Sequence, residues 1–120
     1  MSDTSRLAVL ETGEPAVRIL SAIAALNRTG THGEFVAIIA LLPGAPSWHA
    51  READEIVALT STNPADIAAR LLEAGVELVW PGWLPGVHHH DLVAACESAG
   101  LQVVGPSAAT IAELADQQRL

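Results

Sequence analysis

The stretch Val79-Trp80-Pro81-Gly82-Trp83 and its counterpart Val103-Val104-Gly105-Pro106-Ser107 decide the fold of this chain. Each is an apolar strand that ends in a Gly/Pro turn, and each turn opens onto a helical pattern. The two stretches lie one βα unit apart. Turns that follow strands in this way form the ligand-facing loops of α/β proteins. The pair therefore predicts an α/β fold whose functional loops include these two turns.

Apolar runs alternate with helix-period segments along the whole chain. Strands are predicted at residues 7–10, 35–42, 55–59, 77–80 and 101–104. Helices are predicted at residues 14–27, 64–74 and 91–99, with a last helix after Ser107. Such alternation implies parallel strands, helices on both faces and right-handed crossovers. We expect an α/β fold, a Rossmann-like three-layer sandwich with a mostly parallel sheet of about five strands.

Length and composition bound the organisation of the chain. Its 120 residues suit one domain, so we expect a single domain over residues 1–120. No uninterrupted apolar stretch nears the roughly 18 residues that span a bilayer, and we expect no signal peptide. The lone cysteine, Cys96, is interpreted as core filler within a helix. A lone cysteine fits a cytoplasmic location.

The charge balance narrows the range of partners. The 14 acidic residues outnumber the 6 basic ones, and the formal net charge is −8. Repulsion between this charge and phosphate groups argues against nucleic acid and anionic membranes as partners. The same shortage of cations argues against a triphosphate site built by this chain alone.

The first predicted strand runs into the turn Leu10-Glu11-Thr12-Gly13-Glu14-Pro15. A dinucleotide-binding turn needs three glycines, so this turn, with one, predicts no nicotinamide or flavin cofactor. Glu14 is interpreted as stabilising the amino end of the helix through the macrodipole. Arg18 lies four residues further on, and we expect an i,i+4 contact between the two side chains.

No catalytic or metal-binding set is recognised in the sequence. His88, His89 and His90 are consecutive, cannot direct three ligands at one metal, and are interpreted as a solvated helix entry. Asp54 and Glu55 face opposite ways on an extended segment, which argues against an acid/base pair. No nucleophile with a neighbouring base is visible. We therefore expect no metal site and no catalytic residue.

Four motifs resemble those of a known family. Residues 13–20, Gly-Glu-Pro-Ala-Val-Arg-Ile-Leu, resemble the first helix of the amino-terminal (pre-ATP-grasp) domain of biotin carboxylase. His49 with Ala53-Asp54-Glu55 resembles its His-x-x-x-Ala-Asp-Glu segment, and the two turns quoted first resemble its His-Pro-Gly-Tyr-Gly and Ile-Gly-Pro turns. The resemblance covers residues 6–117. Pro15, Trp80 and Trp83 are most similar to the version in large single-chain acyl-CoA carboxylases.

The resemblance implies machinery that uses ATP and bicarbonate to carboxylate biotin on a carrier protein. In that family this domain packs against the ATP-grasp portion, and most nucleotide and bicarbonate ligands come from later domains. The implied partners are the ATP-grasp portion or other carboxylase subunits. The isolated chain is expected to bind no cofactor and to be inactive, since ATP and biotin belong to the complete enzyme.

Departures from the family pattern concentrate in the turns. Glu11-Thr12 replaces the usual Asn-Arg, and residues 84–89 replace Gly-Phe-Leu-Ser-Glu-Asn. Asp116 and Gln117 are nucleotide-proximal by resemblance, but Gln117 replaces a lysine that contributes to nucleotide binding in the family. This pattern suggests a retained scaffold whose site is lost or shifted.

Two hypotheses follow, with a third beside them. The chain is either the docking amino-terminal domain of the biotin carboxylase component of an acyl-CoA carboxylase, or a degenerate stand-alone paralogue acting as a protein-binding or regulatory module. A third reading is a small-ligand binder at the strand ends near Gly82 and Gly105. Trp80 is expected in the core and Trp83 on a contact surface. The residues expected at turns or docking surfaces are Gly13, Glu14, Arg18, Trp80, Gly82, Trp83, Gly105 and Pro106.

Overall fold

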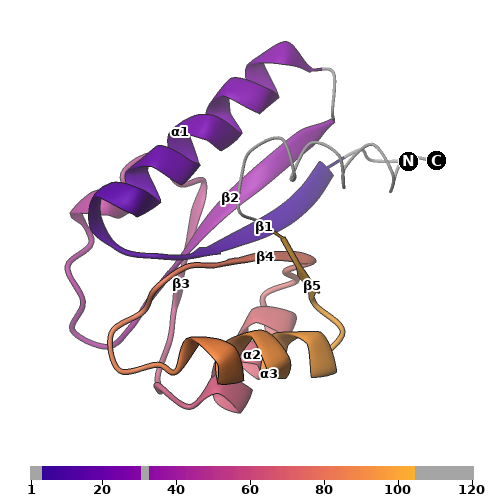
Figure 1. Ribbon diagram of the computed structural model, residues 1–120. Coiled ribbons are helices and arrows are strands. Elements are labelled where there is room, and N and C mark those ends of the chain that lie inside the picture. Colours follow the sequence, from indigo (N-terminus) through magenta and orange to yellow (C-terminus); the bar gives the residue numbers. More distant parts are fainter. Residues whose placement is uncertain (1–3, 31–32, 105–120) are drawn as a thin grey trace.

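The computed structural model describes residues 4–30 and 33–104 (Figure 1). The elements in chain order are β1 (Thr4–Leu10), α1 (Gly13–Thr29), β2 (Glu34–Leu41), the short 3₁₀ helix η1 (Trp48–Ala50), β3 (Glu55–Ala58), α2 (Pro64–Glu73), β4 (Leu78–Pro81), α3 (His89–Ser98) and β5 (Gln102–Val103). Every strand and helix predicted within these residues is present, with small shifts at the ends. The helix predicted after Ser107 lies outside the described residues. Within the described ranges, no helix is long and apolar enough to cross a membrane.

The strands form one sheet in the order β3-β2-β1-β4-β5, and all neighbouring strands are parallel. The chain builds outward from β1 to β3 and then returns to add β4 and β5 on the other side of β1. The order therefore reverses between β1 and β4. Open α/β sheets place their ligand-facing crevice beyond the carboxyl ends of the strands at such a point. The predicted Rossmann-like fold is confirmed.

Helices cover both faces of the sheet, with α1 on one face and α2 and α3 on the other (Figure 1). Strand residues alternate between the two layers because successive side chains point to opposite faces. Leu7 and Val9 pack in the α1 layer, whereas Ala8 and Leu10 pack in the α2–α3 layer. Cys96 on α3 is fully buried, and burial raises the pKa of its thiol to about 11. Its interpretation as core filler is confirmed.

Local hydrogen bonds set where the helices begin. The Asn63 side chain accepts hydrogen bonds from the N–H groups of Ala65 at 2.9 Å and Asp66 at 3.3 Å, and so caps α2 as predicted. The helix predicted over residues 91–99 begins earlier, at His89. The cause is His88, whose ring accepts a hydrogen bond from Asp91 N–H at 3.4 Å and serves as the N-cap.

An ion-pair network joins several elements at the amino-terminal edge of the sheet. Arg6 on β1 donates from both Nη atoms to the carboxylate of Glu55 on β3, at 2.7 and 2.8 Å. It also donates to the Ala74 carbonyl after α2 at 2.9 Å, and its backbone N–H donates to Glu77 at 3.0 Å. We term Arg6, Glu55 and Glu77 the amino-edge clamp. Arg6 lowers the pKa of Glu55, chiefly through their hydrogen bond.

Candidate functional site

Two turns that are distant in sequence meet at the carboxyl-terminal edge of the sheet. Glu11 follows β1, and Gly82 with Trp83 follows β4. The Glu11 carboxylate accepts hydrogen bonds from Trp83 N–H at 3.1 Å and from Thr12 N–H at 3.3 Å. Hydrogen bonds to an ionised acceptor are among the stronger ones in proteins. The turn after β1 therefore holds the backbone of the turn after β4.

Gly82 lies directly against Glu11. A Cβ atom added to Gly82 would stand 2.9 Å from Glu11 Cβ and would overlap the Glu11 carboxylate. The φ angle of Gly82 is not positive, so its lack of a side chain serves close approach rather than an unusual backbone conformation. On the other side, the Gly82 carbonyl lies 3.2 Å from His89 Nδ1 at the start of α3. The turn is thus held from two elements.

The two tryptophans around this turn lie in different environments. Trp80 is half-buried and packs against the core in the α1 layer. Trp83 is 62% exposed. Because its own backbone N–H is bound by Glu11, the Trp83 indole is a large apolar group presented to solvent on a fixed main chain. Such a group can serve as an anchor for a binding partner.

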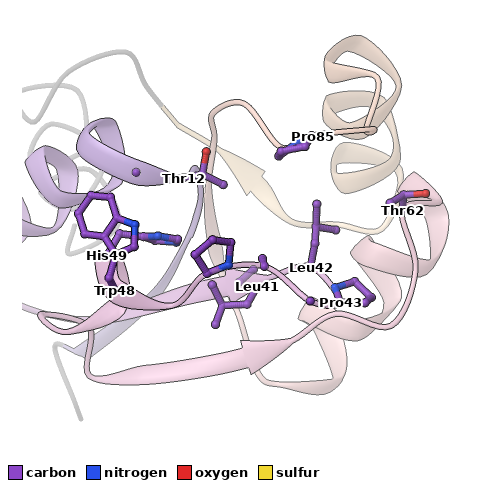
Figure 2. A pocket seen from close by; sticks show the side chains of 13 residues that line it. Thr12, Leu41, Leu42, Pro43, Trp48, His49, Thr62 and Pro85 are labelled. Atoms are coloured by element: carbon purple, nitrogen blue, oxygen red, sulfur yellow. The ribbon is translucent and has the colours of Figure 1, made fainter.

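A cavity of about 540 Å³ opens near these turns, over the ends of β1 and β2 (Figure 2). Its walls come from the turn between β1 and α1, the loop after β2 and η1. Thr62 and Pro85 complete it from the far side. Aliphatic and proline side chains make up most of the walls. None of the described residues that line it carries a carboxylate, guanidinium or ammonium group.

His49 is the buried polar side chain of this cavity wall. It is only 2% exposed, and neither ring nitrogen has a hydrogen-bond partner among the described residues. Trp48 meets it edge-on, with ring centroids 5.7 Å apart and planes at 87°, while remaining 54% exposed. Figure 2 shows the two rings together at one side of the cavity, opposite Thr62 and Pro85. The cavity therefore combines apolar walls with one polar group that lacks a protein partner.

The residues predicted at the first turn occupy the start of α1. Gly13 lines the cavity and has φ of 62°. Glu14 lies in the first turn of the helix, where its negative charge interacts favourably with the positive end of the macrodipole. The contact expected between Glu14 and Arg18 is not formed as an ion pair, and both side chains are exposed. An exposed i,i+4 pair gains only about 0.3–0.5 kcal/mol, too little to order two long side chains reliably.

The other polar residues singled out in the sequence have structural positions. Asp54 accepts a hydrogen bond from Ala37 N–H at 2.8 Å, whereas Glu55 binds Arg6, so the adjacent carboxylates are held apart. Residues 88–90 are exposed at the entry of α3. Among the residues that the structure describes, no group of three His, Cys, Asp or Glu side chains could hold a metal ion.

Several predicted residues cannot be placed. Gly105, Pro106, Asp116 and Gln117 lie outside the described residues. The second turn and the nucleotide-proximal positions therefore stay predictions from the sequence.

Sequence reasoning missed the cavity and the burial of His49. One signal could have indicated them. The loop Pro43-Gly44-Ala45-Pro46 follows a buried strand directly, lacks charge, and leads to Trp48 and His49. An apolar loop at the carboxyl end of a parallel strand is where an α/β fold places a binding surface.

Residues 3–111 match the family described as biotin carboxylase, N-terminal domain. Two solved structures of similar fold are of pyruvate carboxylase from Rhizobium etli, one a variant with the allosteric activator acetyl coenzyme A and one the complete multifunctional enzyme. They are 19% and 18% identical over 92% and 95% of this chain, each with a TM-score of 0.64. A search of the curated proteins gives no match.

The match to the family extends over most of the chain, and the similarity to the solved structures supports the same fold. This chain spans only 12% of the length of either pyruvate carboxylase, so it corresponds to one part of such a protein. The chain belongs to the family of biotin carboxylase amino-terminal domains.

Proposed function

We propose that this chain is the amino-terminal domain of the biotin carboxylase component of an acyl-CoA carboxylase, with a structural and docking role. The complete enzyme would use ATP and bicarbonate to carboxylate biotin on a carrier protein, and this chain alone would catalyse no reaction. The family match supports the carboxylase assignment. The resemblance of Pro15, Trp80 and Trp83 to single-chain acyl-CoA carboxylases supports the narrower assignment to an acyl-CoA carboxylase.

The observation that carries the docking role is the exposed indole of Trp83 on a restrained turn. Glu11 binds the Trp83 N–H, and Gly82 packs against Glu11 without room for a side chain. Because the backbone of this turn is already ordered, docking through it loses less conformational entropy than docking through a flexible loop. Tryptophan is also among the residues that contribute most at protein interfaces. The turn is therefore suited to docking against an ATP-grasp portion.

The charges around the turn after β1 support the proposal that the ATP-grasp portion, and not this chain, binds the nucleotide. Glu11 and Glu14 lie at the amino end of α1, a position where many α/β proteins bind phosphate. Two carboxylates there repel a phosphate group. Among the described residues that line the neighbouring cavity, none supplies a compensating cation. ATP and biotin are accordingly assigned to the complete enzyme.

Complementation in trans tests this proposal. A biotin carboxylase lacking its own amino-terminal domain is mixed with the chain, and biotin-dependent ATP hydrolysis is measured. We expect the unchanged chain to restore activity. Trp83→Ala should weaken the restoring interaction by roughly 30-fold, the effect of losing about 2 kcal/mol at an interface anchor. Leu72→Ala, which removes another exposed apolar side chain from α2, should restore activity as well as the unchanged chain.

The alternative is a degenerate stand-alone paralogue that acts as a protein-binding or regulatory module. Glu11 favours it, because this carboxylate stands at a turn position where the family resemblance leads us to expect a neutral amide. That alternative predicts that the chain does not restore activity and that it either inhibits an intact carboxylase or leaves it unchanged. A chain that fails to restore activity would therefore contradict the docking function.

A further inference from the structure

We propose that the cavity over β1 and β2 binds an uncharged, flat heteroaromatic small molecule, with His49 as its hydrogen-bonding residue and Trp48 as a movable cover. We term this cavity the His49 site. It is distinct from the docking turn, because Trp83 does not line it.

The imidazole of His49 is buried and has no hydrogen-bond partner among the described residues. His49 is only 2% exposed, and neither Nδ1 nor Nε2 has a hydrogen-bond partner among the described residues. Each ring nitrogen can donate or accept a hydrogen bond. A buried polar group without a partner destabilises the fold, so most such groups in proteins are satisfied by protein, water or ligand. A ligand with its own donor and acceptor would satisfy this one.

Trp48 controls access to the imidazole. Both His49 nitrogens are shielded in the structure, so a ligand reaches them only when a neighbouring group moves. The Trp48 indole lies in T-shaped contact with His49 and is 54% exposed, which leaves it free to change rotamer. After such a rotation its flat face can stack on an aromatic ligand. The pair therefore supplies both a polar contact and a stacking surface.

The remaining walls select against charge. Leu41, Leu42, Pro43 and Pro46 contribute aliphatic surface, and no described lining residue is acidic or basic apart from His49. Burying an ion in such a cavity without a counter-charge is unfavourable. Weak polar contacts remain at one end, where Thr12 lines the cavity and its side chain makes no capping hydrogen bond to α1. The walls thus favour a neutral molecule with few polar atoms.

Size and position agree with a small-molecule site. Ligand pockets in proteins typically enclose about 300–1,000 Å³, and this cavity encloses about 540 Å³. It also lies beyond the carboxyl ends of parallel strands next to the point where strand order reverses. One hypothesis from the sequence is a small-ligand site near Gly82 and Gly105. The cavity lies instead on the β1–β2 side of the same edge of the sheet.

Benzimidazole is the probe for this site, because it is flat, bicyclic and uncharged near neutral pH, and it has one donor and one acceptor. Indene has the same shape without either nitrogen and is the matched control compound. Binding is followed by NMR of the full chain, using the amides of Gly13 and Gly44, the indole N–H of Trp48 and the ring nitrogens of His49. We expect saturable shifts at all of these with benzimidazole, and binding of indene that is weaker by at least about tenfold.

Variants separate the roles of the two rings. His49→Phe replaces the imidazole with a somewhat larger aromatic ring that has no hydrogen-bonding nitrogen, and should lower benzimidazole affinity by at least about tenfold, while leaving the thermal midpoint unchanged or raised. Trp48→Ala should weaken both compounds by removing the stacking face. Trp83→Ala, which removes the other highly exposed indole, should bind benzimidazole as the unchanged chain does. If His49→Phe does not fold, the His49 ring-nitrogen shifts in the unchanged chain still decide the question.

Each outcome either supports or overturns the proposal. It is overturned if benzimidazole gives no saturable shift, if indene binds equally well, or if the His49 nitrogens do not respond. It is also overturned if the shifts centre on Trp83. Failure here leaves the docking function intact, because Trp83→Ala and Trp48→Ala affect different measurements.

Discussion

The two edges of the sheet differ in how their key polar side chains are hydrogen-bonded. At the amino-terminal edge, the amino-edge clamp joins Arg6 to two carboxylates and to the Ala74 carbonyl. At the carboxyl-terminal edge, His49 is buried without a partner among the described residues, and Trp83 is 62% exposed. Satisfied polar groups favour a stable fold, whereas unsatisfied ones are the local conflicts expected at functional sites. The amino-terminal edge thus holds its polar groups in mutual contacts, and both proposed binding sites lie at the carboxyl-terminal edge.

Gly82→Val tests the carboxyl-terminal edge most severely. The new Cβ would collide with Glu11, and relieving the overlap must displace the turn that carries Trp83. We expect a loss of about 3 kcal/mol in the free energy of unfolding, near the upper end for overpacking, together with loss of complementation. Urea denaturation followed by the trans assay measures both effects.

Gly30→Ala is the matched control for this substitution. Gly30 ends α1 with φ of 65°, and an added Cβ would meet no atom within 4 Å. We expect a cost of only about 1 kcal/mol from backbone strain, with complementation retained. Equal costs at Gly30 and Gly82 would show that the contact with Glu11 does not restrain the turn.

Arg6→Met tests the amino-terminal edge. Methionine keeps much of the aliphatic stem but removes the guanidinium that reaches Glu55 and Ala74. Because these groups are partly exposed, we expect a loss of only about 1 kcal/mol in the free energy of unfolding. Complementation and benzimidazole binding should be unchanged. A loss of either would mean that the two edges are coupled rather than independent.

The fold could be predicted from the sequence because its signals are local. Buried parallel strands appear as apolar runs, and the Asn63-Pro64 pair marks the start of α2. The predicted first strand, residues 7–10, missed the segment from Thr4 to Arg6. Those polar residues do not form an apolar run, yet they pair with residues 34–36 of β2. Main-chain pairing extended the strand beyond its apolar part.

The site was predictable only in part, because its decisive contacts are not local. The turn at Gly82 is evident from its neighbours in sequence, whereas the contact with Glu11 spans the switch from β1 to β4. The burial of His49 likewise depends on how the loop after β2 folds against α1. Neither contact has a signature in residue spacing.

The smallest expected effect is a pH dependence confined to the amino-edge clamp. The hydrogen bond from Arg6 lowers the pKa of Glu55 below its ordinary value of 4.5. A carboxyl group with a lower pKa in the folded state adds stability that is complete above its unfolded pKa and is lost as pH falls through the folded pKa. Glu55→Gln should therefore lower the urea midpoint slightly at about pH 7 and make no difference well below the folded pKa. A Glu55→Gln difference that persists at low pH would mean that packing, and not charge, gives the amino-terminal edge its contribution.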